Sequence, residues 1–197
     1  MLPRLPSRTP STAPRPPWPV AAFALLTLLS AAAVGLTASD TFTRMTMAAA
    51  VIACIGLRQT LHDPVVTTGL TTIVMGAVLG WGLDFYDRIW WYDDLAHFLF
   101  SLVGTMAVAR LVLHRFDARP AVALPIALWL AWQGIGALWE IGEWTSDRLQ
   151  ATAHSRGYID TMTDMILNST GSGLGAAAYW RWLRQPAATS TTTRPRT

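Results

Sequence analysis

The chain has 197 residues, of which 52% are hydrophobic and 14% are charged. Soluble domains carry about 25% charged residues, so this composition excludes an ordinary soluble domain and indicates a membrane protein. The formal net charge is only +3, and the basic residues, all arginine, lie at the ends of apolar segments. We therefore expect a lipid bilayer as the partner and no nucleic acid. The single cysteine, Cys54, excludes an intramolecular disulfide and a cysteine-cluster metal site.

The N-terminal residues 1–19 are rich in proline and arginine, and they lack an apolar face, so we expect a disordered tail. Residues 20–38 carry no charge over the length needed to cross a hydrocarbon core of about 30 Å. We expect a first spanning helix there. A cleaved signal peptide is the alternative, but its apolar region would be only about 7 to 15 residues long and would end at a small-residue cleavage site.

Five further apolar segments follow, at 45–57, 65–83, 94–113, 121–144 and 161–183. The segment 45–57 is short and can span only if Arg44 and Arg58 extend to opposite interfaces. Residues 76 and 80, and again 171 and 175, are glycines at a spacing that allows close helix contact. We expect an all-α, polytopic membrane bundle of about six helices over residues 20–183, followed by a disordered tail at 184–197.

The distribution of arginine predicts the orientation of this bundle. With six spans and a cytoplasmic N-terminus, eleven arginines face the cytoplasm, and only Arg44, Arg88, Arg148 and Arg156 lie outside. That bias follows the positive-inside rule and places both termini in the cytoplasm. It also places the start of helix four, the end of helix five and the start of helix six at the outer face.

Three polar strings lie at these helix ends: DDLAHF at 93–98, WEIGEW at 139–144 and DTMTDMILNSTG at 160–171. Within each string the polar residues are three or four apart, which puts each set on one helix face. Ionisable groups inside a membrane bundle are costly and usually mark a functional site. The residues of this expected outer pocket are Asp93, His97, Glu140, Glu143, Asp160, Asp164 and Asn168.

We assign candidate roles by residue type. Asp93, Asp160, Asp164 and Asn168 offer oxygen ligands that suit Mg²⁺, Mn²⁺ or Ca²⁺. His97, Glu140 and Glu143 are candidate catalytic groups, and Arg148 and Arg156 are candidates for binding an anionic substrate. Structural roles remain open for some of them: Asp93, Asp94 and Asp160 could cap helices, and His97 could simply pair with one acid.

The order of the strings resembles the YjdF-like family of bacterial inner-membrane proteins and, more remotely, the VanZ-like proteins. The residues that carry the resemblance are Asp93, His97 and Phe98, then Glu140, Glu143 and Trp144, then Asp160, Thr161, Asp164 and Met165. The sequence departs from the family pattern at Asp94, where a basic residue is usual, and at Ile159, where an aromatic is usual. The resemblance implies a multi-pass helical protein of the bacterial cytoplasmic membrane, without implying a reaction.

Three functions are compatible with this pattern. The first is a pocket near the outer face that binds a divalent cation and could act on an envelope lipid or another anionic substrate, although no nucleophile is identifiable. The second is a proton- or cation-coupled transporter, which should show a polar path deeper than Asn168. The third is a non-catalytic scaffold whose buried polar groups determine helix register.

Overall fold

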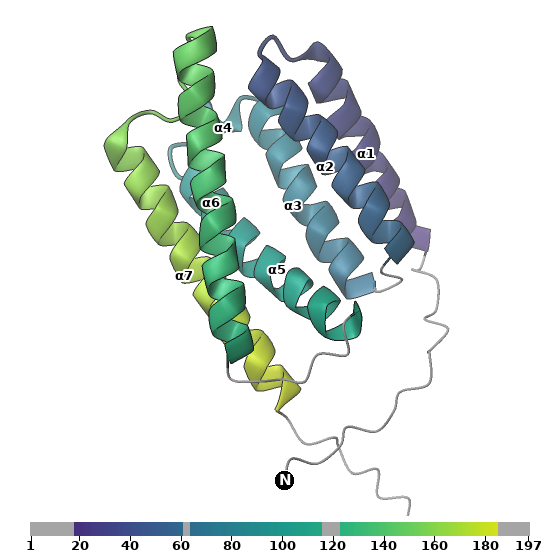
Figure 1. Cartoon of the computed structure of the whole chain (residues 1–197). Coiled ribbons are helices and arrows are strands. Elements are labelled where there is room, and N and C mark those ends of the chain that lie inside the picture. The colour runs from purple at the N-terminus through teal and green to yellow at the C-terminus, as the bar shows by residue number, and fades with distance from the viewer. Residues whose placement is uncertain (1–17, 61–63, 116–122, 185–197) are drawn as a thin grey trace, which may run out of the picture.

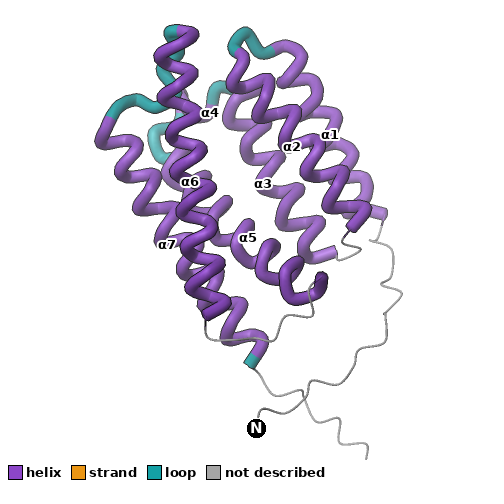
Figure 2. Tube along the Cα trace, viewed as in Figure 1, coloured by secondary structure: helices purple, strands orange, loops and turns teal. Residues whose placement is uncertain are grey.

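A computed structural model describes residues 18–60, 64–115 and 123–184 of the chain. Within these ranges every regular element is a helix (Figures 1 and 2), which confirms the all-α class. The helices are α1 (Trp18–Thr37), α2 (Thr41–Thr60), α3 (Pro64–Gly82), α4 (Phe85–Arg88), α5 (Tyr92–Arg115), α6 (Ala123–Gln150) and α7 (Tyr158–Leu183). The expected tails fall almost wholly on residues 1–17 and 185–197, which are outside the described residues.

The six long helices coincide with the six expected apolar segments, but several are longer. The helix α2 begins at Thr41, well before the expected residue 45, because Asp40 caps it: the backbone N–H of Thr43 donates to Oδ1 of Asp40 at 2.7 Å. The short helix α4 was not expected from the sequence. It lies in the connection between α3 and α5 and begins after Asp84, whose φ of 55° is left-handed.

The expected sixteen-residue loop at 145–160 is wrong, because α6 continues to Gln150 and α7 begins at Tyr158. The shorter connection is organised by Asp147. Its carboxylate accepts hydrogen bonds from the hydroxyl of Thr152 at 2.7 Å, the backbone N–H of His154 at 2.7 Å and the backbone N–H of Ser155 at 2.9 Å. One side chain therefore folds the connection back against the end of α6.

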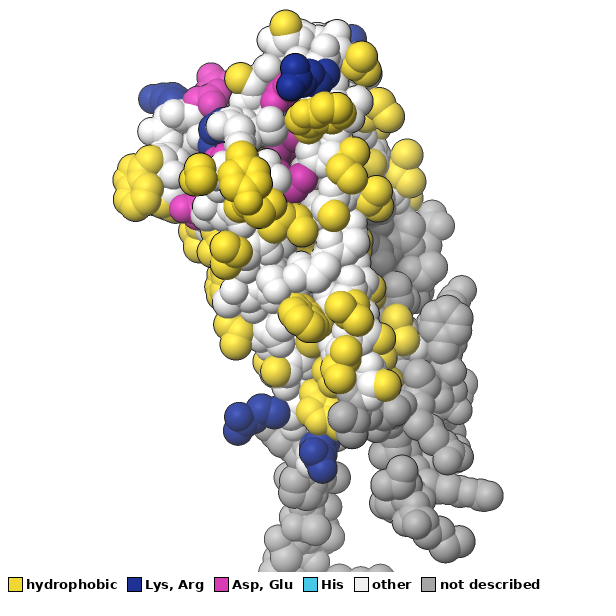
Figure 3. Space-filling view, turned by 60° about the vertical axis from the view of Figure 1, so that its left-hand side comes forward, with side chains coloured by type: hydrophobic (Ala, Val, Ile, Leu, Met, Phe, Trp, Pro, Cys, Tyr) yellow, Lys and Arg dark blue, Asp and Glu magenta, His cyan; other side chains and the backbone are white. Residues whose placement is uncertain are grey.

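The bundle consists of two groups of helices (Figure 1). The helices α1, α2 and α3 pack on one another, and so do α5, α6 and α7, while α5 also packs against α3 and joins the two groups. The described chain begins and ends at the lower end of the bundle in Figure 1. The α1–α2, α3–α5 and α6–α7 connections lie at the opposite end, which we call the acidic end because the described acids gather there (Figure 3).

The distribution of side chains is the reverse of that in a soluble protein. Buried positions include many hydroxyl, amide and carboxyl groups, whereas large apolar side chains on α1, α6 and α7 are exposed, among them Leu25, Leu29, Ile126, Leu130, Leu138, Ile166 and Leu174. Several buried hydroxyls are satisfied along their own helices, as where Thr27 donates to the carbonyl of Phe23 at 2.9 Å. Exposed apolar surface of this extent is typical of helices in contact with lipid.

Glycine brings α5 and α7 into direct backbone contact. A Cβ atom at Gly171 would collide with the carbonyl oxygen of Phe98, and one at Gly175 would lie 2.5 Å from the carbonyl oxygen of Leu102. The small-residue spacing on α7 therefore acts as predicted. On α3 the outcome differs, because Gly76 and Gly80 make room for aromatic rings instead of a helix backbone: Phe100 lies against Gly76 and Tyr86 against Gly80.

Two of the described helices, α1 and α6, contain a stretch long and apolar enough to cross a membrane by length and composition. The expected number of six spans, and the cytoplasmic position of both termini, remain predictions.

Candidate functional site

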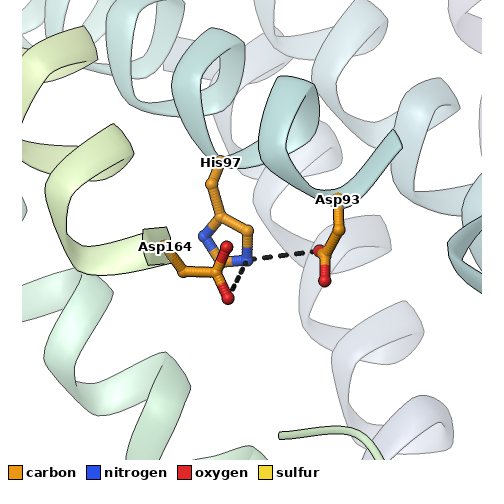
Figure 4. A group of neighbouring side chains, drawn as sticks. All are labelled: Asp93, His97 and Asp164. Atoms are coloured by element: carbon orange, nitrogen blue, oxygen red, sulfur yellow. Dashed lines mark ion pairs between the residues drawn. The ribbon is translucent and has the colours of Figure 1, made fainter. Parts of the chain in front are cut away.

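The structure brings three of the predicted polar residues together at the interface of α5 and α7 (Figure 4). Asp93 and His97 are one turn apart on α5, and Asp164 faces them from α7. Nε2 of His97 lies 3.4 Å from Oδ1 of Asp93 and 3.8 Å from Oδ2 of Asp164. One ligand atom from each of the three residues lies within 4.8 Å of the others, the spacing expected of groups that share a cation.

The other ring nitrogen of His97 belongs to a chain of hydrogen bonds. Nδ1 lies 3.3 Å from Oδ1 of Asn168, which also accepts the hydroxyl hydrogen of Ser101 at 2.6 Å. The Ser101 hydroxyl in turn accepts from Nε1 of Trp132 at 2.6 Å. We call Trp132, Ser101 and Asn168 the polar relay.

The polar relay determines the tautomer of His97. An indole N–H can only donate, so the Ser101 hydrogen must point to Asn168 and makes its Oδ1 an acceptor. Nδ1 of His97 must then carry a hydrogen in order to pair with that oxygen. In the neutral ring, Nε2 is left as a lone pair facing two carboxylates. A positive species, either a proton or a metal cation, is required at that position.

Asp164 is the most deeply placed of the three residues. It is 1% exposed, and neither of its carboxylate oxygens accepts a hydrogen bond from any described residue. A buried ionised group without partners costs several kcal/mol, by an order-of-magnitude estimate. The position is therefore unfavourable unless a cation or a proton compensates the charge.

Arg156 orients the outer acid of this group. Its guanidinium donates to Oδ2 of Asp93 at 3.0 Å and to the backbone carbonyl of Tyr86 at 2.7 Å, and it contacts Asp87 at 3.3 Å. The backbone of Arg156 is left-handed, with φ of 40°, which is uncommon for residues other than glycine. Asp93 thus has one oxygen on Arg156 and the other toward His97.

The remaining predicted residues lie nearby but outside the group of three. Glu143 accepts the indole N–H of Trp139 at 2.8 Å, while Glu140 is 6% exposed. Oδ2 of Asp160 is buried without a described partner. Arg148 lies away from the group and places its guanidinium 5.7 Å from the ring centre of Trp144.

Sequence reasoning missed Ser101 and Trp132, which complete the polar relay. Ser101 is one turn beyond His97 on α5 and is fully buried, and Trp132 lies on α6. The four-residue step from Asp93 to His97 continues to Ser101, and this spacing was the available signal. The indole N–H of Trp132 is the hydrogen-bond donor to Ser101.

A second contact at the acidic end joins the two groups of helices. Nε2 of His154 lies 3.4 Å from Oδ1 of Asp40, and the backbone N–H of Thr41 donates to the Gln150 side chain at 2.8 Å. Burial alone would raise the pKa of Asp40, but hydrogen bonds from Thr43 and the neighbouring His154 outweigh it and hold this pKa below its usual value. Asp40 is therefore ionised at neutral pH.

A cavity of about 730 Å³ lies between the two groups of helices. Its walls come from the ends of α1 and α3, from α4, and from α5, α6 and the α6–α7 connection. Asp93, His97 and Asn168 form part of one wall, and Arg156 is also on the lining. Two of the three ligands, Asp93 and His97, are thus accessible from a space large enough for a small molecule.

Comparisons with known proteins identify the family of the chain. A protein of Thermotoga maritima described as "Uncharacterized protein" is 30% identical over 115 residues, and this match covers 56% of the chain and 59% of the relative. No solved structure matches the chain. The remote VanZ-like resemblance finds no support among the matches. Residues 17–185 match the family described as "Predicted membrane protein (DUF2238)". The chain therefore belongs to this family of membrane proteins.

Proposed function

We propose that this membrane protein binds a divalent metal cation between α5 and α7, with Asp93, His97 and Asp164 as ligands. The observation that carries the proposal is the convergence of one imidazole nitrogen and two carboxylates within 4.8 Å. Mg²⁺, Mn²⁺ and Ca²⁺ all take oxygen ligands, and the imidazole makes Mn²⁺ the first of these to test. Water or a substrate oxygen would complete the coordination.

The surroundings of the three ligands support a metal site. Metal-binding histidines usually donate their second N–H to an oxygen that fixes the ring, and metal-binding carboxylates are themselves hydrogen-bonded. Asn168 offers Oδ1 to the second ring nitrogen of His97, and Arg156 donates to the carboxylate of Asp93. Asn168 then serves as an orienting group and not as a ligand, because its Oδ1 already accepts the Ser101 hydroxyl hydrogen.

The main competing interpretation is a doubly protonated His97 held between Asp93 and Asp164, as a proton-coupled transporter or a structural pair would require. Metal analysis of the purified protein separates the two. After exhaustive dialysis with Mn²⁺ and removal of the free metal, we expect about one equivalent in the wild type and none in Asp164→Asn. The matched control is Asp94→Asn, which removes an acid next to Asp93 but outside the group, and it should retain the metal.

A wild type that retains no Mn²⁺, Mg²⁺, Ca²⁺, Zn²⁺ or iron would exclude the metal site and leave the imidazolium pair. If the single variants Asp164→Asn and His97→Ala both retained the metal, the ligands would have to be other residues. Size-exclusion profiles and helical circular dichroism of each variant show whether the fold is intact, so that a lost metal is not confused with a misfolded protein.

We also infer that the protein is YjdF-like and multi-pass in the bacterial cytoplasmic membrane, with the acidic end outside. Two observations support this orientation: the described chain begins and ends at the end of the bundle opposite the acids, and α7 ends there with Arg181 and Arg184. Reporter fusions at residues 117 and 154 test it. We expect cytoplasmic activity for the first and external activity for the second, and the opposite result would invert the topology.

Action on an anionic envelope lipid, the finer form of the sequence hypothesis, has less support. Arg156 pairs with Asp93 and Asp87, and Arg148 stacks on Trp144. Of the two, only Arg156 lines the described cavity, and it is already paired with two acids. The proposed cation site can still take an anionic oxygen as a ligand. The acids lining the rest of the cavity, however, favour a cationic ligand.

A further inference from the structure

The cavity between the two groups of helices has an aromatic wall. Trp81, Tyr86 and Trp139 all line it. The ring centres of Trp81 and Trp139 are 5.6 Å apart with planes inclined at 34°, and those of Trp81 and Tyr86 are 5.4 Å apart. Phe100 and Trp132 line the cavity as well. Aromatic side chains from α3, α4, α5 and α6 thus converge on a single space.

The acids on the same lining outnumber the arginines. The described lining contains Asp40, Asp84, Asp87, Asp93 and Glu143, and its only arginine is Arg156. That arginine already pairs with Asp87 and Asp93. If a divalent cation is held by Asp93 and Asp164, it cancels those two charges and leaves Asp40, Asp84 and Asp87 opposite Arg156. The cavity carries excess negative charge in either case.

One of these acids contacts the aromatic wall directly, and a second is linked to it through two other rings. Glu143 lies beside Trp139, accepts its indole N–H at 2.8 Å, and is 8% exposed. Among the described residues this is its one hydrogen bond, so its second oxygen is available to the cavity that it lines. At the other end, Asp40 contacts His154, whose ring lies against Phe42, and Phe42 packs on both Trp81 and Trp139.

We propose that this cavity binds an organic cation, an ammonium compound with apolar substituents. Aromatic faces attract a cation through the negative face of the ring, and they suit a weakly hydrated ammonium group better than a hydrated metal ion. An anionic ligand would meet the excess of carboxyl groups, and a neutral apolar ligand would leave those groups unpaired. The volume of about 730 Å³ is within the range of small-molecule sites.

This inference goes beyond the proposed metal site and does not depend on it. The two sites share a wall at Asp93 and His97, but the aromatic wall is formed by other residues. The Asp164→Asn variant, in which we expect the metal to be lost, should therefore still bind an organic cation. Failure of one proposal would leave the other standing.

Isothermal titration calorimetry of the full chain in non-ionic detergent tests the proposal with three benzyl compounds of similar shape and different charge. These are benzyltrimethylammonium, its neutral isostere neopentylbenzene, and the anion benzylphosphonate, each corrected for protein-free micelles. We expect the ammonium probe to bind at least tenfold more tightly than the other two. Equal binding of the neutral isostere, tighter binding of the anion, or no binding of any probe would overturn the proposal.

Two variants that replace a carboxyl group by an amide locate the binding site. Glu143→Gln keeps the side-chain shape and should weaken the ammonium probe at least tenfold, whereas Asp94→Asn, outside the lining, should leave its affinity unchanged. Should Glu143→Gln fail to fold, Asp40→Asn serves instead, because asparagine can still cap α2. Metal content is measured on the same samples. Unchanged ammonium affinity in both Glu143→Gln and Asp40→Asn would refute the assignment to this cavity.

Discussion

Nδ1 of His97 lies 3.3 Å from Oδ1 of Asn168, and this pairing turns Nε2 toward Asp93 and Asp164. The orientation originates on a third helix, because the Trp132 indole N–H determines the direction of the Ser101 hydroxyl. Side chains from α5, α6 and α7 therefore together determine the direction of the Nε2 lone pair of His97.

Removing the Ser101 hydroxyl should weaken metal binding without removing a ligand. In Ser101→Ala, Asn168 loses a donor and is free to rotate, so the ring of His97 is no longer fixed. Loss of such an orienting partner typically lowers metal affinity about 10- to 100-fold. A titration of the chelator-treated protein with Mn²⁺ measures the change.

The control for this variant is Ser169→Ala, which removes a hydroxyl that pairs with Trp129 on the outer side of the α6–α7 interface. It should retain wild-type affinity.

A purely structural role of Ser101 would lower the thermal midpoint of Ser101→Ala equally in EDTA and in Mn²⁺. The positioning role predicts instead that the Mn²⁺-dependent increase of the midpoint becomes smaller.

The Asp164→Asn variant should change stability in opposite directions with and without metal. In EDTA the wild type keeps a buried carboxylate without a described hydrogen-bond partner, so the neutral amide should stabilise the protein by on the order of 1 kcal/mol. In saturating Mn²⁺ the wild type should be the more stable protein, since only it binds the metal. Thermal denaturation under both conditions measures the crossover, and the absence of a crossover would contradict the metal site.

Gly171→Ala should destabilise the α5–α7 interface. The added Cβ would collide with the carbonyl oxygen of Phe98, so the two helices must separate at a cost of about 1 to 3 kcal/mol. Gly134→Ala is the matched control, because nothing lies within 4 Å of a Cβ at that position on α6. It should be neutral or slightly stabilising, by up to about 1 kcal/mol.

Denaturation by SDS in mixed micelles measures both glycine variants. If Gly171→Ala were as stable as Gly134→Ala, the close backbone contact between α5 and α7 would be disproved.

Asp40 should contribute to stability in a pH-dependent manner. Its pKa in the folded protein is below the unfolded value of about 3.9, so its contribution is fully present above that value and is lost as the pH falls through the folded pKa. The Asp40→Asn variant should therefore be less stable than wild type at pH 7, by at most about 1 kcal/mol, and the difference should vanish once the pH is below the folded pKa.

The comparison with Asp40→Ala separates charge from capping. Alanine removes the cap of α2, so this variant should lose about 1 kcal/mol more than Asp40→Asn throughout the pH range. Thermal midpoints at several pH values measure both effects. A pH-independent difference between Asp40→Asn and wild type would show that the carboxylate charge has no role.

The positions of the helices could be predicted from the sequence because the apolar segments are long and separated by charges or proline. The bounds were less predictable. The end of α6 was placed at Trp144, since the following Thr, Ser and Asp residues are typical of a loop, yet Asp147 folds the connection back and lets the helix continue to Gln150. The left-handed Asp84 before α4 leaves no recognisable pattern in the sequence.

Half of the candidate site could be predicted in the same way. Helical spacing and topology indicated that Asp93, His97 and Asp164 would lie at the same end of the bundle. The spacing could not show that Glu140 and Glu143 lie outside the group of three, because that depends on the rotation of α6 about its axis. Nor could it identify Ser101 and Trp132, whose importance arises from a hydrogen bond between two helices.

The most direct test of the central claim is pulsed electron paramagnetic resonance of Mn²⁺ bound to the purified protein. A metal held by Asp93, His97 and Asp164 should show coupling to a single imidazole nitrogen, and this coupling should vanish in His97→Ala while it persists in His154→Ala. Protein that binds no Mn²⁺, or bound Mn²⁺ without nitrogen coupling, would contradict the account.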